Sequence, residues 1–296
     1  MQTNKSLFDE IKYIYLSGNG TVKLIFINVL VFLVIQILLA IDRLTLSAIG
    51  HQIIELFSLN CTWRGLIFTP WGLLTNIFVH ESFLHLAFNM LFLYFAGTLF
   101  ESIFDKKRLI YTYIFGGIAG GMLEVISHYT FPGLESGGFV IGASGAIMAI
   151  FVAIAFYSPN TKVLFFGVFP VPIYLVALFF LLRDIMNVGS SNEIAHFAHI
   201  GGAIFGMISV NNIHSQNNSM HFLYRLFNSF GNLFTSKRPR KTAPSGKAWK
   251  SDEQYNLDKK KRQQKTDAIL DKISKSGYES LSREEKDFLF NQSKNG

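Results

Sequence analysis

The chain is poor in cysteine, with Cys61 alone among its 296 residues. A single cysteine excludes an intramolecular disulfide framework and offers no cysteine cluster for a metal ion. Charged residues are also scarce at 16%, whereas 50% of the residues are hydrophobic and 30 are phenylalanine. This composition is too apolar for an ordinary soluble domain and indicates a protein that crosses a membrane several times.

The positive charge belongs to one end of the chain. The net charge is +7, but residues 214–296 contain 17 Lys or Arg and only 9 Asp or Glu, so residues 1–213 are close to neutral. Basic runs in this tail predict a linker over residues 214–264 that is mostly disordered and attracted to anionic lipid. Residues 265–296 are expected to form a short helical pair, in which Gly277 ends the first helix and Ser282 to Glu285 forms a capping box for the second.

Six apolar stretches predict six transmembrane helices, at about 22–41, 82–101, 109–129, 142–157, 171–188 and 194–212. The expected fold is therefore an all-α membrane protein, with a six-helix bundle over residues 21–213 and a cytoplasmic tail. Residues 1–20 are expected to form an N-terminal interfacial segment, with a short amphipathic helix at 6–16. No small-residue cleavage site follows the first stretch, which we interpret as an uncleaved span and not as a signal peptide.

The charges of the loops predict the orientation in the membrane. Six spans put both termini on one side, and that side carries the basic loop at 105–108 and the basic tail. The opposite loops contain only Arg43, Arg64 and Arg183. Because basic loops stay cytoplasmic, we expect both termini to be cytoplasmic, in a multi-pass protein of a bacterial cytoplasmic (inner) membrane.

Ser144 and His199 are the candidate catalytic residues. The predicted topology starts spans two, four and six on the outer side, so His85, Ser144 and His199 share one shallow depth below that surface. Serine is a weak nucleophile and needs a general base, and His199 could accept its proton and return it to a leaving amine. No acidic residue lies at that depth on span six, so the sequence predicts a dyad and not a triad.

Two glycines support this pairing. Gly202 and Gly206 follow His199 at i+3 and i+7, so they share its helical face and would let span four pack closely. The alternative is that Ser144 only packs against a neighbouring helix and that His199 is a buried polar contact, but the shared depth argues against it.

His85 and Asn89 lie on one face of span two, because they are four residues apart. Polar groups inside a membrane helix are costly and usually serve a purpose. With the backbone N–H of Ser144, they could donate hydrogen bonds to the oxyanion that forms during peptide hydrolysis. The alternative is that they only bond neighbouring helices.

Other polar patterns are weaker. His80 and His85 nearly match the HExxH zinc motif, but their five-residue spacing turns them about 140° apart on a helix, so no metal site is predicted. The segment around Ser144 is not a G-x-S-x-G elbow, because position 146 is alanine and no strand is expected before it. Glu124, with His128, is expected at a wetted helix end, and His196 is not expected to be the base because it lies a turn nearer the surface.

These residues resemble the rhomboid family of intramembrane serine proteases. The resemblance covers about residues 20–212 and rests on three motifs in order: His80 to Asn89, Gly142 to Gly145, and Ala198 to Gly206. It implies hydrolysis of a peptide bond in or beside a substrate's transmembrane helix, near the outer membrane face. Ser144 would be the nucleophile and His199 the base. Oxyanion stabilisation is assigned to His85, Asn89 and Gly142, and supporting roles to His80, Met148, Gly202 and Gly206.

The sequence departs from the family pattern at two places. Met148 stands where an aromatic residue often packs on the catalytic histidine, and Gly72 follows Trp71 where some members have arginine. The alternative function is a catalytically inactive relative that binds membrane proteins, although both Ser144 and His199 are present. A transporter is disfavoured because the polar residues cluster at one depth. The expected partners are transmembrane protein substrates and the lipid bilayer, with no cofactor and no nucleic acid.

Overall fold

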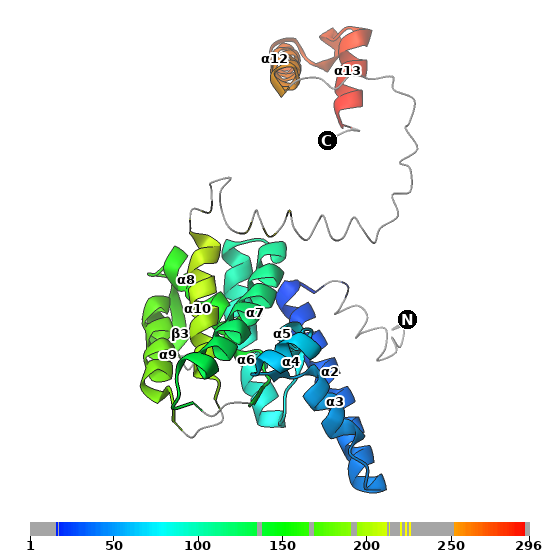
Figure 1. Cartoon of the computed structure of the whole chain (residues 1–296). Coiled ribbons are helices and arrows are strands. Elements are labelled where there is room, and N and C mark those ends of the chain that lie inside the picture. The colour runs from blue at the N-terminus through cyan, green and yellow to red at the C-terminus, as the bar shows by residue number, and fades with distance from the viewer. Residues whose placement is uncertain are drawn as a thin grey trace. The chain divides into compact units, whose positions relative to one another are not determined.

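The computed structural model describes residues 18–134, 138–165, 169–190, 194–211 and 252–293, with single positions at 16, 213, 220, 223 and 225. The chain divides into two compact units, residues 1–231 and 232–296. The interfacial helix predicted at 6–16 lies outside the described residues, except for its last position. The first unit contains the helical bundle in Figure 1, and the second contains the two helices labelled α12 and α13.

Six helices of the first unit coincide with the six apolar stretches. They are α2 (Gly20–Thr45), α6 (Phe83–Ile103), α7 (Lys106–Thr130), α8 (Ser144–Tyr157), α9 (Ile173–Asn187) and α10 (His196–Val210). Among the described residues, α2, α6 and α7 are long and apolar enough to cross a bilayer, while α8 and α10 are apolar but shorter. The protein is therefore an integral membrane protein with several membrane-spanning helices, and the number six stays a prediction.

The connections contain more structure than the sequence predicted. Between α2 and α6 lie α3 (Ile49–Phe57), β1 (Leu59–Asn60), α4 (Trp63–Phe68), α5 (Gly72–Thr75) and the 3₁₀ helix η1 (Asn76–Phe78). Strand β1 pairs antiparallel with β2 (Phe139–Val140), and β3 (Lys162–Phe165) pairs with β4 (Phe169–Pro172). The fold is thus mostly helical but not all-α. Pro170 and Pro172 lie in β4, where a two-stranded ribbon leaves one edge of each strand unpaired and tolerates them.

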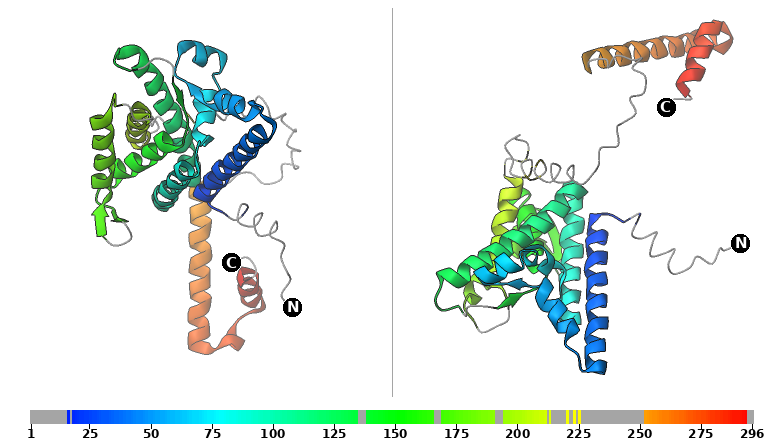
Figure 2. Two further views of the ribbon diagram at one scale, coloured as in Figure 1. Left: turned by 90° about the horizontal axis from the view of Figure 1, so that it is seen from below. Right: turned by 45° about the vertical axis from the view of Figure 1, so that its right-hand side comes forward.

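Helices α7, α8 and α10 form the packed centre of the first unit, and α10 lies against both others in Figures 1 and 2. In α8, every residue from Gly145 to Ala155 is buried. A Cβ atom on Gly202 would lie 2.0 Å from the carbonyl oxygen of Gly145, and one on Gly206 would lie 2.3 Å from that of Ala149. The two helices therefore touch backbone to backbone, which is how membrane helices gain close contact without a hydrophobic driving force.

Carboxylates cap two helices of the first unit. Glu101 of α6 accepts hydrogen bonds from the backbone N–H groups of Gly20 and Thr21, at 2.7 and 3.0 Å, at the start of α2. Asp42 of α2 accepts one at 2.7 Å from the N–H of Gly50 in the first turn of α3. The first N–H groups of a helix have no partner within that helix, so these contacts satisfy them.

The second unit is a helical pair, as the sequence predicted, but its first helix is longer. It contains α12 (Asp252–Ser276), the 3₁₀ helix η2 (Tyr278–Ser280) and α13 (Arg283–Ser293). The capping box is present, because the N–H of Ser282 donates to Glu285 at 2.7 Å and the N–H of Glu285 donates back to the Ser282 hydroxyl at 3.3 Å. The boundary predicted at residue 264 is wrong, since the end of the expected linker already belongs to α12. The rest of that linker lies almost wholly outside the described residues.

We expect Gly202→Ala to destabilise the first unit, because the new methyl group would lie 2.0 Å from the Gly145 carbonyl oxygen and force α8 and α10 apart. Overpacking of this kind costs about 1–3 kcal/mol. Thermal unfolding of the purified protein in detergent measures the effect. Gly133→Ala is the matched control, because a Cβ atom there meets no described atom within 4 Å. Equal midpoint temperatures for the two variants would contradict the backbone contact.

Candidate active site

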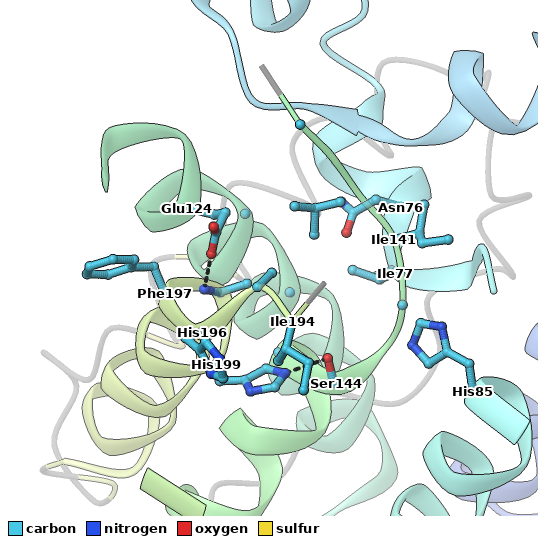
Figure 3. A pocket seen from close by; sticks show the side chains of 18 of the residues that line it. Asn76, Ile77, His85, Glu124, Ile141, Ser144, Ile194, His196, Phe197 and His199 are labelled. Atoms are coloured by element: carbon cyan, nitrogen blue, oxygen red, sulfur yellow. Dashed lines mark hydrogen bonds between the residues drawn. The ribbon is translucent and has the colours of Figure 1, made fainter. Parts of the chain in front are cut away.

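The structure brings Ser144 and His199 into direct contact. Ser144 is the first residue of α8, and His199 lies in the first turn of α10. The Oγ atom of Ser144 is 2.7 Å from Nε2 of His199, as the dashed line in Figure 3 marks. The contact follows from the backbone packing below it, because Gly145 and Gly202 hold the starts of both helices together. A hydroxyl and an imidazole at this distance can exchange a proton.

Gly142 shapes the turn that leads into α8. Its φ of +114° lies in the left-handed region that favours glycine. A Cβ atom there would lie 2.7 Å from Nε2 of His85, so the missing side chain makes room for that ring. The N–H of Gly142 donates to the carbonyl oxygen of Asn76 at 2.9 Å. This bond uses the only donor of Gly142, so its assignment as an oxyanion donor does not fit the structure, and its role is to admit His85.

His85 and Asn89 of α6 approach the same turn. Figure 3 shows the half-buried His85 ring pointing toward the ribbon that leads into Ser144. Asn89 is buried, and its side-chain amide donates to the carbonyl oxygen of His85 at 2.9 Å. Its Nδ2 atom lies 3.9 Å from the position a Cβ would take on Gly142. An amide nitrogen carries two hydrogens, so one N–H of Asn89 is left for another acceptor.

His80 supports His85 from the segment before α6. Its side chain is fully buried, and its ring meets that of His85 edge to face with centroids 5.1 Å apart. Burial lowers the pKa of His80 to about 4, so the ring is neutral at pH 7. The edge of one ring thus packs on the face of the other, an arrangement that fits a packing role for His80.

Asp184 is the polar residue at the site that the sequence analysis missed. It lies on α9 and its side chain is 1% exposed. Its Oδ2 atom is 2.9 Å from Nδ1 of His199, and its Oδ1 atom is 2.9 Å from Nδ1 of His196. The prediction of a dyad considered acids on span six only, whereas this carboxylate comes from the neighbouring helix. His196, the first residue of α10 and one turn before His199, is likewise buried beside the site.

Glu124 also differs from its prediction. It is 7% exposed, not wetted, and its Oε2 atom accepts a hydrogen bond of 2.8 Å from the N–H of Ala198. His128 lies 3.4 Å from the other carboxylate oxygen. Glu124 thus caps the first turn of α10 from α7, where a negative charge is favourable near a helix N-terminus. Figure 3 shows this bond above the Ser144 and His199 pair.

Among the described residues, Asp184, His196 and His199 form a group whose side chains could bind a metal ion. Their ligand atoms lie within 4.8 Å of one another. The two Asp-to-His distances of 2.9 Å are those of direct hydrogen bonds. The group therefore forms a hydrogen-bonded network as it stands.

One cavity of about 1610 Å³ joins these residues. Its lining includes Ser144, His199, His85, Asn89 and Met148, together with apolar side chains of α6, α8 and α9. Met148 is 7% exposed and lies in the core of the bundle, one turn below Ser144. The candidate nucleophile, the candidate base and the candidate oxyanion donors thus line one common space.

Comparison with known protein families finds a different match in each of the two units. A model of the rhomboid domain matches residues 68–215, which is half of the chain and includes every candidate site residue. A model of a family of unknown function (DUF6576) matches residues 250–295, the region of α12 and α13.

Three curated relatives show the extent of the similarity. RHOMBOID-like protein 12, mitochondrial, of Arabidopsis thaliana is 32% identical over 149 residues, which are 46% of this chain and 44% of the relative. Rhomboid protease GluP of Bacillus subtilis (strain 168) is 30% identical over 47% of this chain and 25% of its own length. Rhomboid protein 1, mitochondrial, of Saccharomyces cerevisiae is 28% identical over 55% of this chain and 50% of its own length. The chain spans half or less of each relative. Because two are mitochondrial, the expected bacterial membrane stays a prediction.

We expect Glu124→Ala to lower the stability of the first unit by about 1–3 kcal/mol, the cost of leaving a buried donor without a partner. The donor is the N–H of Ala198, which loses its acceptor at 2.8 Å. Glu124→Gln keeps an acceptor oxygen and should lose less. Thermal unfolding in detergent ranks the three proteins, and an Ala variant as stable as the wild type would contradict the capping role.

Proposed function

The chain belongs to the rhomboid family, and on this premise we propose that it is an intramembrane serine endopeptidase that cleaves transmembrane proteins near the outer membrane face. The observation that carries the proposal is the distance of 2.7 Å between Ser144 Oγ and His199 Nε2. The name of one relative, Rhomboid protease GluP, supports peptide hydrolysis as the reaction of such a domain.

The reaction would proceed in two steps. Ser144 Oγ attacks the scissile carbonyl carbon while His199 Nε2 takes the hydroxyl proton, which gives a tetrahedral intermediate. The intermediate collapses as His199 returns that proton to the departing amine, leaving an acyl group on Ser144. Water, deprotonated by the same imidazole, then attacks the acyl carbon and releases the carboxylic acid and free Ser144.

The oxyanion of both intermediates would be stabilised from α6 and from the start of α8. Asn89 has one amide hydrogen beyond the one it gives to His85. The imidazole of His85 and the backbone N–H of Ser144, in the first turn of α8, are the other donors. Gly142 contributes by its lack of a side chain, which lets His85 approach.

The shape of the site favours a peptide substrate. A volume of about 1610 Å³ exceeds the 300–1,000 Å³ of typical small-molecule pockets. An extended segment of a substrate helix would fit this volume and the apolar side chains that line it. The proposal includes six spans with both termini cytoplasmic, which puts the starts of α8 and α10 near the outer face. Helix α8, with 14 residues, extends about 21 Å at 1.5 Å per residue. It can therefore begin below that face.

We expect a fluorophosphonate probe to label the purified protein in detergent and to lose this labelling in both Ser144→Ala and His199→Ala, because nucleophile and base act as a unit. Ser102→Ala is the control, since that hydroxyl on α6 bonds only locally, to the carbonyl oxygen of Leu99 at 2.7 Å. A folded wild-type protein that does not react, beside an active relative that does, would sink the protease proposal and favour a membrane-protein binding role.

Asn89→Ala should slow probe labelling and peptide cleavage by about 10²–10³-fold, the usual loss for one oxyanion donor. Asn28→Ala is a close control. Asn28 is also a buried asparagine in a membrane helix, and it bonds the carbonyl oxygen four residues earlier, Leu24, at 2.8 Å. Asn28 also donates to the Tyr113 hydroxyl at 3.0 Å, so its variant loses at least as much structural contact as Asn89→Ala. An equal loss of rate in both variants would assign Asn89 a structural role only.

A further inference from the structure

We infer that Asp184 is a positioning residue, whose carboxylate fixes the tautomer and the orientation of His199 and is itself held in place by His196. The inference rests on the proposed function, since it concerns how His199 serves as the base for Ser144. It replaces the predicted dyad with a chain of contacts from Ser144 through His199 to Asp184 and His196.

The distances give the direction of each hydrogen bond. A carboxylate has no hydrogen and only accepts, so the Nδ1 atoms of His196 and His199, each 2.9 Å from one oxygen of Asp184, must carry their protons. A neutral imidazole has a proton on one nitrogen only. Nε2 of His199 is therefore left with its lone pair, and it faces the hydroxyl of Ser144 at 2.7 Å. This is the tautomer that a general base requires.

The burial of Asp184 is consistent with these hydrogen bonds, because a buried carboxylate needs donors around it. A carboxylate that is 1% exposed is costly unless charge partners and donors surround it. Asp184 has the two imidazole N–H groups, and Nη1 of Arg183 lies 3.8 Å from its Oδ1 atom. Removing one member of this set takes a hydrogen bond from each neighbour in these buried surroundings, so the carboxylate and both rings hold one another in a single geometry.

His196 explains why the carboxylate cannot turn away. His196 and His199 are three residues apart, so both face α9 from successive positions on α10, with ring planes 88° apart. Each ring is hydrogen-bonded to a different oxygen of the Asp184 carboxylate. A rotation of Asp184 that released His199 would also break the bond to His196, so the second histidine stabilises the orientation of the first.

Asp184 also joins α9 to α10. The buried residues of α9 are Ile173, Val176 and Ala177 in its first half and Asp184 near its end. In the described structure Asp184 is thus the buried contact of the second half of α9. Removing the carboxylate will cost stability as well as orientation, and the experiment has to separate the two effects.

The test compares Asp184→Asn with the wild type by the rate of fluorophosphonate labelling per folded molecule. The amide of asparagine offers one acceptor and one donor group, so it cannot accept from both histidines. In Ser-His-Asp sites the equivalent change lowers kcat by about 10⁴-fold through the wrong tautomer. We expect a loss of about 10²–10⁴-fold in labelling, with partial recovery in Asp184→Glu, which restores a carboxylate.

A second measurement reads the tautomer itself. In protein with ¹⁵N-labelled histidine, the ring nitrogens of His199 are assigned by their disappearance in His199→Gln. The wild type is expected to show a protonated Nδ1 and an unprotonated Nε2, and Asp184→Asn a loss of this preference. An unchanged tautomer in Asp184→Asn would overturn the inference, whether or not the protein cleaves peptides.

Asp42→Asn is the matched control. Asp42 is a buried aspartate of α2, 3.2 Å from Nδ1 of His51, and it is not among the described residues that line the cavity. We expect this variant to lose stability but to label at the wild-type rate. If wild type labels and Asp184→Asn labels equally fast, the positioning role fails and the protease stands. If both aspartate variants lose rate in proportion to stability, the role of Asp184 is structural. If the folded wild type does not label, the proposed protease activity is wrong. The tautomer measurement then decides alone whether Asp184 positions His199.

Discussion

The backbone contact between α8 and α10 is the constraint on which the site depends. In lipid, helices gain little from burying apolar side chains against one another, and close approach through small residues takes over that role. Gly202 on Gly145 and Gly206 on Ala149 leave no space for a side chain between the two backbones. Ser144 and His199 lie in the first turns of these helices, so glycines that carry no reactive side chain set the distance between the candidate nucleophile and its candidate base.

Around this contact, the polar groups of the site are held from neighbouring helices. Glu124 of α7 caps the turn that carries His199, and Asp184 of α9 binds the imidazole directly. From the other side, Asn76 fixes the turn at Gly142 that admits His85. Each group is anchored by packing or by a hydrogen bond before any substrate arrives. Such pre-organisation is what electrostatic stabilisation of a transition state needs, because fixed dipoles do not have to reorient during the reaction.

The sequence predicted the pair at the centre of the site better than its surroundings. Depth along a helix can be counted from its ends, so the starts of spans two, four and six pointed to His85, Ser144 and His199 as neighbours. The acids were missed because spans three and five end on the same side, and the residues near those ends lie at the same depth. Glu124 and Asp184 are both of this kind. Which acid contacts which histidine depends on which helices are neighbours in the bundle. That arrangement follows from tertiary packing and cannot be counted along the sequence. The two short sheets were missed because strands of two to four residues are too short to show an alternating pattern. The early start of α12 was missed because its basic run was taken as part of a linker.

The double use of one carboxylate has a consequence for how this site can vary in evolution. His199 is hydrogen-bonded to both Ser144 and Asp184, whereas His196 is joined to this network by its hydrogen bond to Asp184. A lineage that loses the acid at position 184 takes a hydrogen bond from the buried imidazole at position 196, whereas a change at 196 alone takes one donor from the buried carboxylate. Positions 184 and 196 should therefore covary among related chains, and the pair should mark a subgroup within the family instead of being scattered across it.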